Sequence, residues 1–314
     1  MPVPLRGLHH VTATVDRAQP DLDFCVALLG LRLVKQTVNF DNRRVFHFYY
    51  GDERGSPGSI WTTFPYHGHG VRPGVHGAGQ VTATAFSVPV AALPAWGERL
   101  QRAGAGVSER ATRFGEPALV VSDPSGLIVH LVASDADARI PWAGGAVPAS
   151  EAIRGLHSVT LQVREEAPTV AFLVEVLGGT VAAEDEGCVR LSVGDGCPGA
   201  WLDVRQDSSS PIAVNGTGTV HHVALAINDH AAQRQLRDDL IRRGVTVTDV
   251  LDRQYFQSIY FREPGGVLIE VATVEPGFTT DEPLDRLGLT LQLPPWEEPR
   301  RAEIEAGLPA IVRR

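Results

Sequence analysis

Two pairs of adjacent histidines and one late glutamate are the residues of this chain best suited to metal chemistry. The pairs are His9-His10 and His221-His222, each followed by valine, and the glutamate is Glu270 in an apolar stretch. Two imidazoles and one carboxylate can hold a divalent, redox-active metal while leaving coordination positions open. Because neighbouring side chains of a strand point to opposite faces, we expect one histidine of each pair to reach such a metal. The other histidine of each pair then needs a separate role.

Composition limits the classes of partner. The 314 residues, of which 43% are hydrophobic and 21% charged, suffice for a packed core. A formal net charge of -9 disfavours nucleic acid or an anionic membrane as a partner. No apolar run approaches membrane-spanning length and the first residues carry no apolar signal core, so the sequence predicts a cytoplasmic protein. The three cysteines lack C-x-x-C spacing, which argues against a disulfide framework or a thiolate zinc site.

The elements that must position these residues repeat along the chain. Four segments share one order: an alternating opening strand, a helix ended by glycine, and further strands that close after a turn. The opening strands begin at Gly7, Gln80, Gly155 and Gly218. The expected helices cover 20–29, 91–103, 167–177 and 229–243, with Asp229 as the N-cap of the last. We call these segments modules one to four, each a βαβββ unit.

The repeats predict an α+β protein in which four βαβββ modules pair into two open, barrel-like domains. Modules one and two would occupy residues 1–135, and modules three and four residues 155–275. The segment between them, 136–154, is rich in Ala, Gly and Pro and is expected to be a linker. Residues 276–314 lose the pattern and are predicted to form a Pro-rich extension, packed on the body or on a second subunit of a homo-oligomer.

One residue of each opening strand and one of each closing strand fall at positions that we align between modules. In chain order, the opening set is His10, Ala83, His157 and His222, and the closing set is Thr62, His130, Asp203 and Glu270. Modules one and four together would supply two histidines and one carboxylate, as would modules two and three, whereas modules three and four would supply four ligands. Only modules one and four carry a second histidine beside each candidate ligand, which favours their pairing around the metal.

Three segments carry a resemblance to a known family. They are the two His-His-Val strands, the run Pro-Gly-Gly-Val-Leu-Ile-Glu-Val at 264–271, and residues 252–261. On these segments the chain resembles the vicinal-oxygen-chelate superfamily of glyoxalases, bleomycin resistance proteins and extradiol dioxygenases. Within it, the chain is similar to dioxygenases that cleave hydroquinones. The resemblance implies the vicinal-oxygen-chelate fold and ferrous iron bound by His10, His222 and Glu270, with Mn(II) as an alternative.

The same resemblance implies an outer shell formed by His9, His221, Arg253 and Tyr260. The two histidines would carry protons, Tyr260 would hydrogen-bond the substrate, and Arg253 would stabilise developing negative charge. The expected function is Fe(II)-dependent, extradiol-type cleavage of a hydroquinone-like or catechol-like ring. Its partners would be a small aromatic substrate and O2.

Two other functions fit the same fold. A glyoxalase-type lyase or isomerase would use a four-ligand metal site, and a non-catalytic protein that binds an aromatic drug or quinone would tolerate loss of Glu270. The set of His130, His157 and Asp203 is more typical of buried structural residues, although the sequence leaves open a second metal there.

Overall fold

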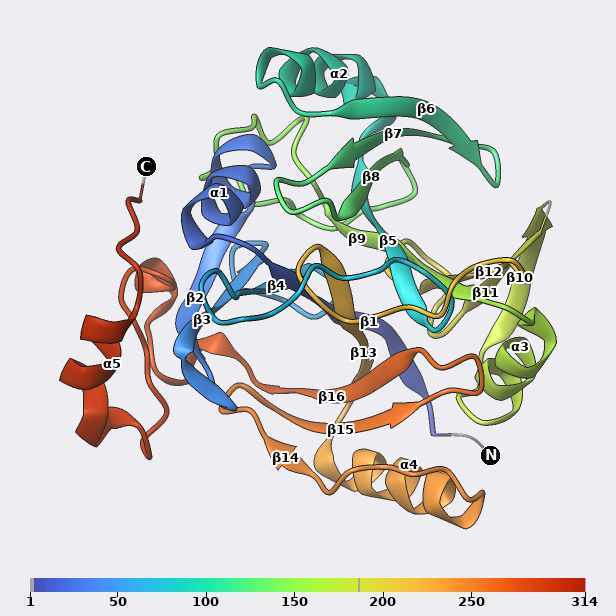
Figure 1. Ribbon diagram of the computed structural model, residues 1–314. Helices are drawn as coiled ribbons and strands as arrows, with labels where there is room; N and C mark the ends of the chain where they lie inside the picture. The colour runs from blue at the N-terminus through green and yellow to red at the C-terminus, as the bar shows by residue number, and fades with distance from the viewer. Residues whose placement is uncertain (1–2, 186, 314) are drawn as a thin grey trace.

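Two eight-stranded sheets dominate the computed structural model, which describes residues 3–185 and 187–313 (Figure 1). The first sheet has the order β14-β15-β16-β13-β1-β4-β3-β2. Its strands are β1 Leu5–Val15, β2 Arg32–Asn39, β3 Asn42–Gly51, β4 Ile60–Pro65, β13 Thr219–Ile227, β14 Leu251–Asp252, β15 Phe256–Arg262 and β16 Leu268–Pro276. The second sheet has the order β10-β11-β12-β9-β5-β8-β7-β6. Its strands are β5 Gln80–Val88, β6 Val107–Arg113, β7 Glu116–Ser122, β8 Ile128–Ala133, β9 Gly155–Val163, β10 Thr180–Asp185, β11 Cys188–Ser192 and β12 Trp201–Gln206.

Each sheet joins strands from two modules: one and four in the first sheet, two and three in the second. In the first sheet, β1 of module one runs antiparallel to β13 of module four. In the second sheet, β5 of module two runs antiparallel to β9 of module three. Figure 1 shows the result, with the dark blue β1 lying beside the orange strands of the last module. The two halves of the first sheet therefore come from opposite ends of the chain.

Every module contains the same parallel pair, formed by its opening and closing strands. The pairs are β1 with β4, β5 with β8, β9 with β12 and β13 with β16. A helix follows each opening strand, which gives the βαβββ order predicted from the repeats. Residues at equivalent register positions in these pairs can thus be compared between modules.

The four predicted helices are confirmed, with differences of a few residues at their ends. They are α1 Ala18–Leu22 continued by a π-helical turn Asp23–Leu28, α2 Leu93–Arg102 preceded by a 3-10 turn Val90–Ala92, α3 Glu166–Glu175 and α4 His230–Arg242. Asp229 is the N-cap of α4, where its Oδ1 accepts a hydrogen bond from the backbone N–H of Ala232 at 2.8 Å. Gly30, after the first helix, has a φ of 73°, a left-handed conformation that glycine adopts without strain.

The helices cover the sheets with apolar faces. Trp96 and Leu100 of α2 and Leu236 and Leu240 of α4 are buried against the strands. Burial of one such side chain stabilises the fold by about 1.5–3 kcal/mol. This packing leaves the opposite face of the first sheet available for the polar side chains of a site.

The C-terminal extension packs on the body of the same chain. It contains 3-10 turns at Phe278–Thr280, Leu284–Arg286 and Glu298–Arg300 and the helix α5 Arg301–Gly307, which lies beside β2 and β3 in Figure 1. Leu293 and Ile304 bury themselves against Val38 of β2. The fully buried Nζ of Lys35 lies 2.5 Å from Asp281 and 2.6 Å from Glu282. A buried ion pair and an apolar cluster therefore fix the extension to the outer strand of the first sheet.

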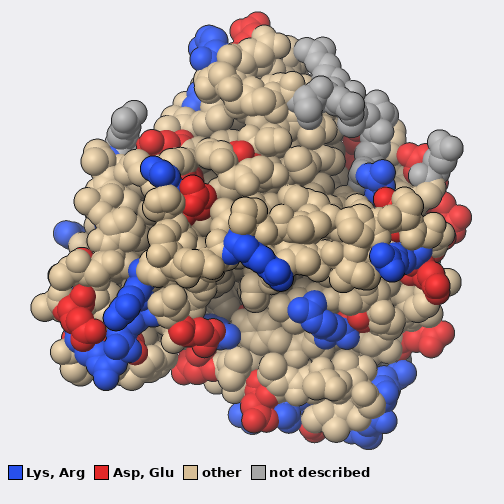
Figure 2. All heavy atoms as spheres, viewed as in Figure 1, with Lys and Arg blue, Asp and Glu red and all other residues tan. Residues whose placement is uncertain are grey.

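Surface charge is mixed. On the face that Figure 2 shows, Lys and Arg side chains alternate with Asp and Glu over the described part of the chain. No helix within residues 3–185 and 187–313 is long and apolar enough to cross a membrane.

Candidate metal centre and its pocket

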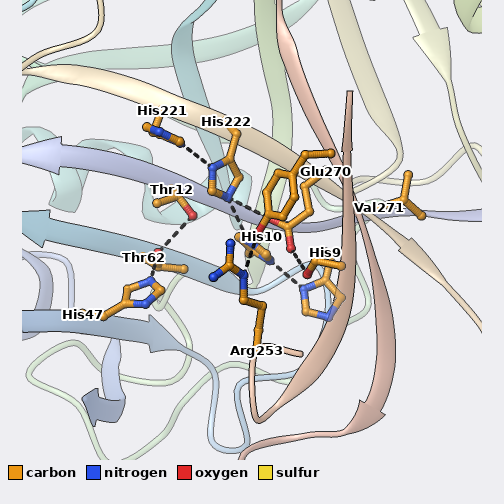
Figure 3. Close-up of polar contacts among 12 residues, drawn as sticks. His9, His10, Thr12, His47, Thr62, His221, His222, Arg253, Glu270 and Val271 are labelled. Atoms are coloured by element: carbon orange, nitrogen blue, oxygen red, sulfur yellow. Dashed lines mark hydrogen bonds and ion pairs between the residues drawn. The ribbon is translucent and has the colours of Figure 1, made fainter. Parts of the chain in front are cut away.

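His10, His222 and Glu270 meet at the centre of the first sheet (Figure 3). The Nε2 atoms of the two histidines are 3.2 Å apart, and Oε2 of Glu270 lies 3.2 Å from His10 Nε2 and 2.8 Å from His222 Nε2. All three side chains are buried, and Glu270 has no exposed surface. Apart from these two imidazoles, Oε2 has no hydrogen-bond partner among the described residues. A buried carboxylate oxygen in this setting requires a cation for compensation.

The spacing of the three atoms fits a divalent metal. An ion about 2.1 Å from ligands at right angles to one another, as on one face of an octahedron, places those ligands about 3.0 Å apart. The three observed separations, 2.8–3.2 Å, bracket that value. The donor set of two imidazole nitrogens and one carboxylate oxygen also suits iron or manganese. The residues present therefore fit a metal held on one face, with the opposite positions open to other ligands.

The histidines that are not candidate ligands, His9 and His221, contact the ligand histidines next to them, contrary to the expected alternation. A β-bulge in β1 sets two residues, His9 and His10, against a single residue of β13. A second bulge, in β13, adds His221 as the extra residue opposite β1. A bulge turns a side chain toward the same side as its neighbour. As a result, Nδ1 of His9 is 2.9 Å from Nδ1 of His10. The expectation that adjacent side chains face opposite sides is wrong at both pairs.

The two bulges give both candidate ligands the same support. Nδ1 of His221 lies 2.8 Å from Nδ1 of His222, as in the His9–His10 pair. Each contact occupies the ring nitrogen that faces away from Glu270. A hydrogen bond at that nitrogen fixes the tautomer and the orientation of a ligand imidazole.

Charge in the site is arranged as metal ligation requires. Burial opposes ionisation of Glu270, but His10 and His222 beside it hold the pKa of its carboxyl well below the usual value. Burial lowers the pKa of His222, although Glu270 partly offsets this effect. Burial, together with the adjacent imidazole, lowers the pKa of His9 and of His221 to about 3. At neutral pH the site thus presents the Glu270 carboxylate together with the neutral imidazoles of His9, His221 and His222, and deprotonated ligands are the forms that bind metals.

Ser258 is a site residue that the sequence reasoning missed. It is fully buried on β15, and its hydroxyl donates a short hydrogen bond to Oε1 of Glu270. Oε1 is therefore fixed by Ser258, while Oε2 faces the two histidines. No local pattern marks this serine, because it reaches the glutamate diagonally across the strand pair: Ser258 of β15 pairs with Ala272 of β16, and the residue opposite Glu270 is Tyr260.

A cavity of about 300 Å³ opens onto the three candidate ligands. Its lining is His10, Thr12, Asn39, Phe40, Asp41, His47, Tyr49, Phe64, Tyr66, His221, His222, Arg253, Phe256, Tyr260 and Glu270. This volume lies at the lower end of the usual range for small-molecule pockets, so a single aromatic ring matches it in size. Of the four predicted outer-shell residues, His221, Arg253 and Tyr260 line the cavity. His9 does not line the cavity, and its ring lies edge-on against that of Phe256.

Arg253 and Tyr260 form one unit at the cavity wall. Nε of Arg253 donates to the hydroxyl of Tyr260 over 3.3 Å, and the guanidinium lies over the tyrosine ring at 5.4 Å from its centroid. Burial, then the charge of Glu270, raises the pKa of Tyr260, so the phenol keeps its proton. The wall therefore offers a fixed cation and a neutral hydroxyl to a bound molecule.

The second sheet lacks an equivalent ligand group. Ser158 of β9 pairs with Trp201 of β12 as His10 pairs with Ile60 of β4, so Ser158 is the counterpart of His10. The alignment of His157 with His10 is therefore wrong by one residue, and His157 corresponds to His9. The glycines give the same correspondence, because Ser158 follows Gly155 by three residues as His10 follows Gly7.

Arginine occupies the polar centre of the second sheet. Arg190 donates to both carboxylate oxygens of Asp203, at 2.7 and 3.1 Å, and to Glu116 at 2.7 Å. Glu116 also contacts Nε2 of His157 at 3.0 Å. Among the residues that the structure describes, only His10, His222 and Glu270 form a group of three or more metal-binding side chains. The four-ligand alternative is also excluded, because β9 and β13 belong to different sheets.

Comparisons with known proteins agree with this geometry. The sequence model of the "Glyoxalase/Bleomycin resistance protein/Dioxygenase superfamily" matches residues 155–271. "Chlorohydroquinone/hydroquinone 1,2-dioxygenase" of Sphingobium indicum is 36% identical over 312 residues, covering 97% of this chain and 96% of the relative. "Putative ring-cleaving dioxygenase MhqE" of Bacillus subtilis is 40% identical over 305 residues, covering 97% of this chain and 99% of the relative. The chain belongs to the glyoxalase/bleomycin resistance protein/dioxygenase superfamily.

Solved structures place it in the same superfamily fold. A crystal structure titled as a putative dioxygenase from Bacillus subtilis matches with a TM-score of 0.94 at 38% identity, over 99% of both chains. Glyoxalase I from Zea mays matches with a TM-score of 0.62 at 15% identity, over 85% of this chain and 92% of that one, which shows the shared fold. The resemblance and the α+β fold class expected from the sequence are confirmed. Members of the superfamily depend on a metal, and the comparisons support an enzyme of the dioxygenase class.

Proposed function

We propose that this chain is an Fe(II)-dependent, extradiol-type dioxygenase that opens a hydroquinone-like or catechol-like ring with O2, with Mn(II) as the second candidate metal. The observation that carries the proposal is the convergence of His10 Nε2, His222 Nε2 and Glu270 Oε2 on one side of a small cavity. Ferrous iron held by two imidazoles and one carboxylate supplies open positions at which a phenolic oxygen and O2 can bind together. The dioxygenase names of relatives at 36% and 40% identity support the same reaction class.

The protein's own groups would bind the ring and control its charge. Phe64 and Phe256 provide apolar walls, and Arg253 is a permanent cation that would attract and orient a phenolate. Tyr260 keeps its proton and would donate a hydrogen bond to a substrate oxygen. His221 lines the cavity while one of its nitrogens contacts His222, and its lowered pKa keeps the ring neutral, which leaves the other nitrogen to hydrogen-bond the substrate. His9 would act through His10 by fixing the orientation of that ligand.

The residues around the candidate metal site argue against the two alternative functions. An oxygen-independent lyase or isomerase with four protein ligands needs a fourth donor, and the register places Thr62, a weak ligand, at the position equivalent to Glu270. A binding protein without chemistry has no need of a buried carboxylate whose oxygen faces two imidazoles.

The proposal is tested by reconstituting the protein with ferrous iron without oxygen and then measuring O2 uptake and ring-opened products with hydroquinones and catechols. Glu270→Ala should lose both metal binding and O2 uptake. The matched control is Glu116→Ala, because Glu116 is the carboxylate beside a histidine in the second sheet, and this variant should keep both. Metal binding with no O2 uptake on any aromatic would overturn the proposal, as would full activity of Glu270→Ala.

A further inference from the structure

A chain of polar side chains lies next to the candidate ligands and has no place in the proposed chemistry. Nε2 of His47 on β3 is 2.8 Å from the hydroxyl of Thr62 on β4, and that hydroxyl donates to Thr12 on β1 over 3.1 Å. Thr12 and Thr62 are fully buried, whereas His47 is partly exposed to the cavity. In Figure 3 this chain lies on one side of the two ligand histidines and Glu270 lies on the other.

The internal repeat shows that Thr62, in this row of polar side chains, occupies the position in module one that Glu270 occupies in module four. Thr62 pairs with Thr12 in β4 and β1 as Glu270 pairs with Ala224 in β16 and β13. Across the next strand pair, the residue that supports Glu270 is Ser258, and the residue that contacts Thr62 is His47. Module one thus presents a hydroxyl and an imidazole where module four presents a metal-binding carboxylate. His47 and Glu270 line the same cavity.

The imidazole of His47 is held in one orientation. Its ring lies 4.0 Å from the ring of Tyr49 and 4.2 Å from that of Phe64, measured between centroids. Thr62 fixes Nε2, and all of these residues lie on neighbouring strands. A hydrogen-bonding group that is immobilised before binding loses little entropy when a ligand arrives.

The other ring nitrogen is available to a ligand. Nδ1 of His47 has no hydrogen-bond partner within the described part of the chain, and His47 lines the cavity. Burial, followed by the charges of His10 and His222, lowers the pKa of His47 well below its usual value. A neutral imidazole backed by a hydroxyl can either donate or accept at the free nitrogen, because the hydroxyl can reverse its own role.

We infer that His47 is a specificity-determining residue, which hydrogen-bonds the ring oxygen that is not bound at the His10–His222–Glu270 end. The inference rests on the proposed function, which places the first oxygen at the metal. A buried polar group that is left without its partner penalises a ligand that lacks the matching hydroxyl. The pocket therefore selects a dihydroxylated ring over a phenol with a single hydroxyl.

The test is a binding experiment on the zinc-substituted protein, in which the bound ring is not consumed. Hydroquinone and phenol are titrated into wild type and variants by calorimetry. Wild type should bind hydroquinone about tenfold more tightly than phenol, the value of one net hydrogen bond. His47→Phe should bring that ratio close to one while changing phenol affinity by less than about twofold. His47→Gln, which keeps a donor and an acceptor, should restore part of the preference.

Two further variants separate the possible outcomes. Tyr66→Phe removes a second polar group of the lining, whose hydroxyl accepts from Asn39 at 2.8 Å, and should leave the ratio unchanged. Thr62→Val removes the hydroxyl that fixes His47, and valine is similar in shape to threonine. This variant should lower the ratio of hydroquinone affinity to phenol affinity severalfold. It also serves if His47→Phe does not fold.

The results distinguish this inference from the proposed function. Failure of the zinc protein to bind either compound, together with no O2 uptake by the iron protein, would overturn both. Binding of both compounds with equal affinity by wild type would overturn the role of His47 alone. The role of His47 would also be overturned if the preference for hydroquinone over phenol survived in His47→Phe and Thr62→Val, or if it were lost in Tyr66→Phe.

Discussion

Replacement of Ser258 by alanine should weaken metal binding without removing a ligand. The serine hydroxyl donates to Oε1 of Glu270, and both groups are buried. A hydrogen bond to a charged group contributes about 1.5–3 kcal/mol, which corresponds to roughly a 10–100-fold change in an equilibrium constant. Loss of an outer hydrogen bond to a metal ligand typically has an effect of the same size. We therefore expect the dissociation constant for Fe(II) or Zn(II) to rise about 10–100-fold in Ser258→Ala.

Competition with a chromophoric chelator measures this change directly. The matched control is Ser158→Ala, which makes the same substitution at a buried serine on the second sheet, where Ser158 contacts His157 rather than a candidate ligand. Ser158→Ala should leave metal affinity within about twofold of wild type. Equal metal affinity in Ser258→Ala and wild type would refute the conclusion that Ser258 orients Glu270.

Two further predictions concern stability of the metal-free protein. Burial raises the pKa of Asp21 from 3.8 to about 7 despite hydrogen bonds from Tyr50 and Thr63, so the folded state binds more protons than the unfolded state across that interval. Stability from this group is present at low pH and is lost as pH rises, by about 2–3 kcal/mol between pH 5 and 8. Urea unfolding should show that Asp21→Asn removes this part of the slope, and an unchanged slope would contradict it. Lys35→Met leaves the carboxylates of Asp281 and Glu282 uncompensated and should destabilise the protein by about 3–5 kcal/mol in the same assay, whereas a loss below about 1 kcal/mol would show that the ion pair is dispensable.

The candidate ligands could be predicted because their signals are local. His10 and His222 stand in repeated His-His-Val strands, and Glu270 is a charge within an apolar strand, which is costly unless it is compensated. Helix ends were also predictable, because glycines such as Gly30 adopt a conformation that other residues avoid. In both cases the physical cause lies within a few residues of the signal.

The remaining features depend on register and packing. The bulges that turn His9 and His221 toward their neighbours arise only when β1 and β13 pair, so a rule of strict alternation could not anticipate them. Ser258 and His47 gain their roles from the strands opposite them. Lys35 is an ordinary charged residue in the sequence, and its burial depends on a C-terminal segment almost 250 residues later, at Glu282.

The central pairing of β1 with β13 has a consequence for biosynthesis. His10 and His222 are 212 residues apart, and β1 has no antiparallel partner until module four has left the ribosome. During synthesis the second sheet can complete its own pairing first, because β5 to β12 are contiguous in the chain. The amino-terminal strands must wait with an open edge, a state that is prone to wrong pairing and to recognition by chaperones. The candidate metal site is therefore complete only after β16 has been translated, so metal capture there would be a late event.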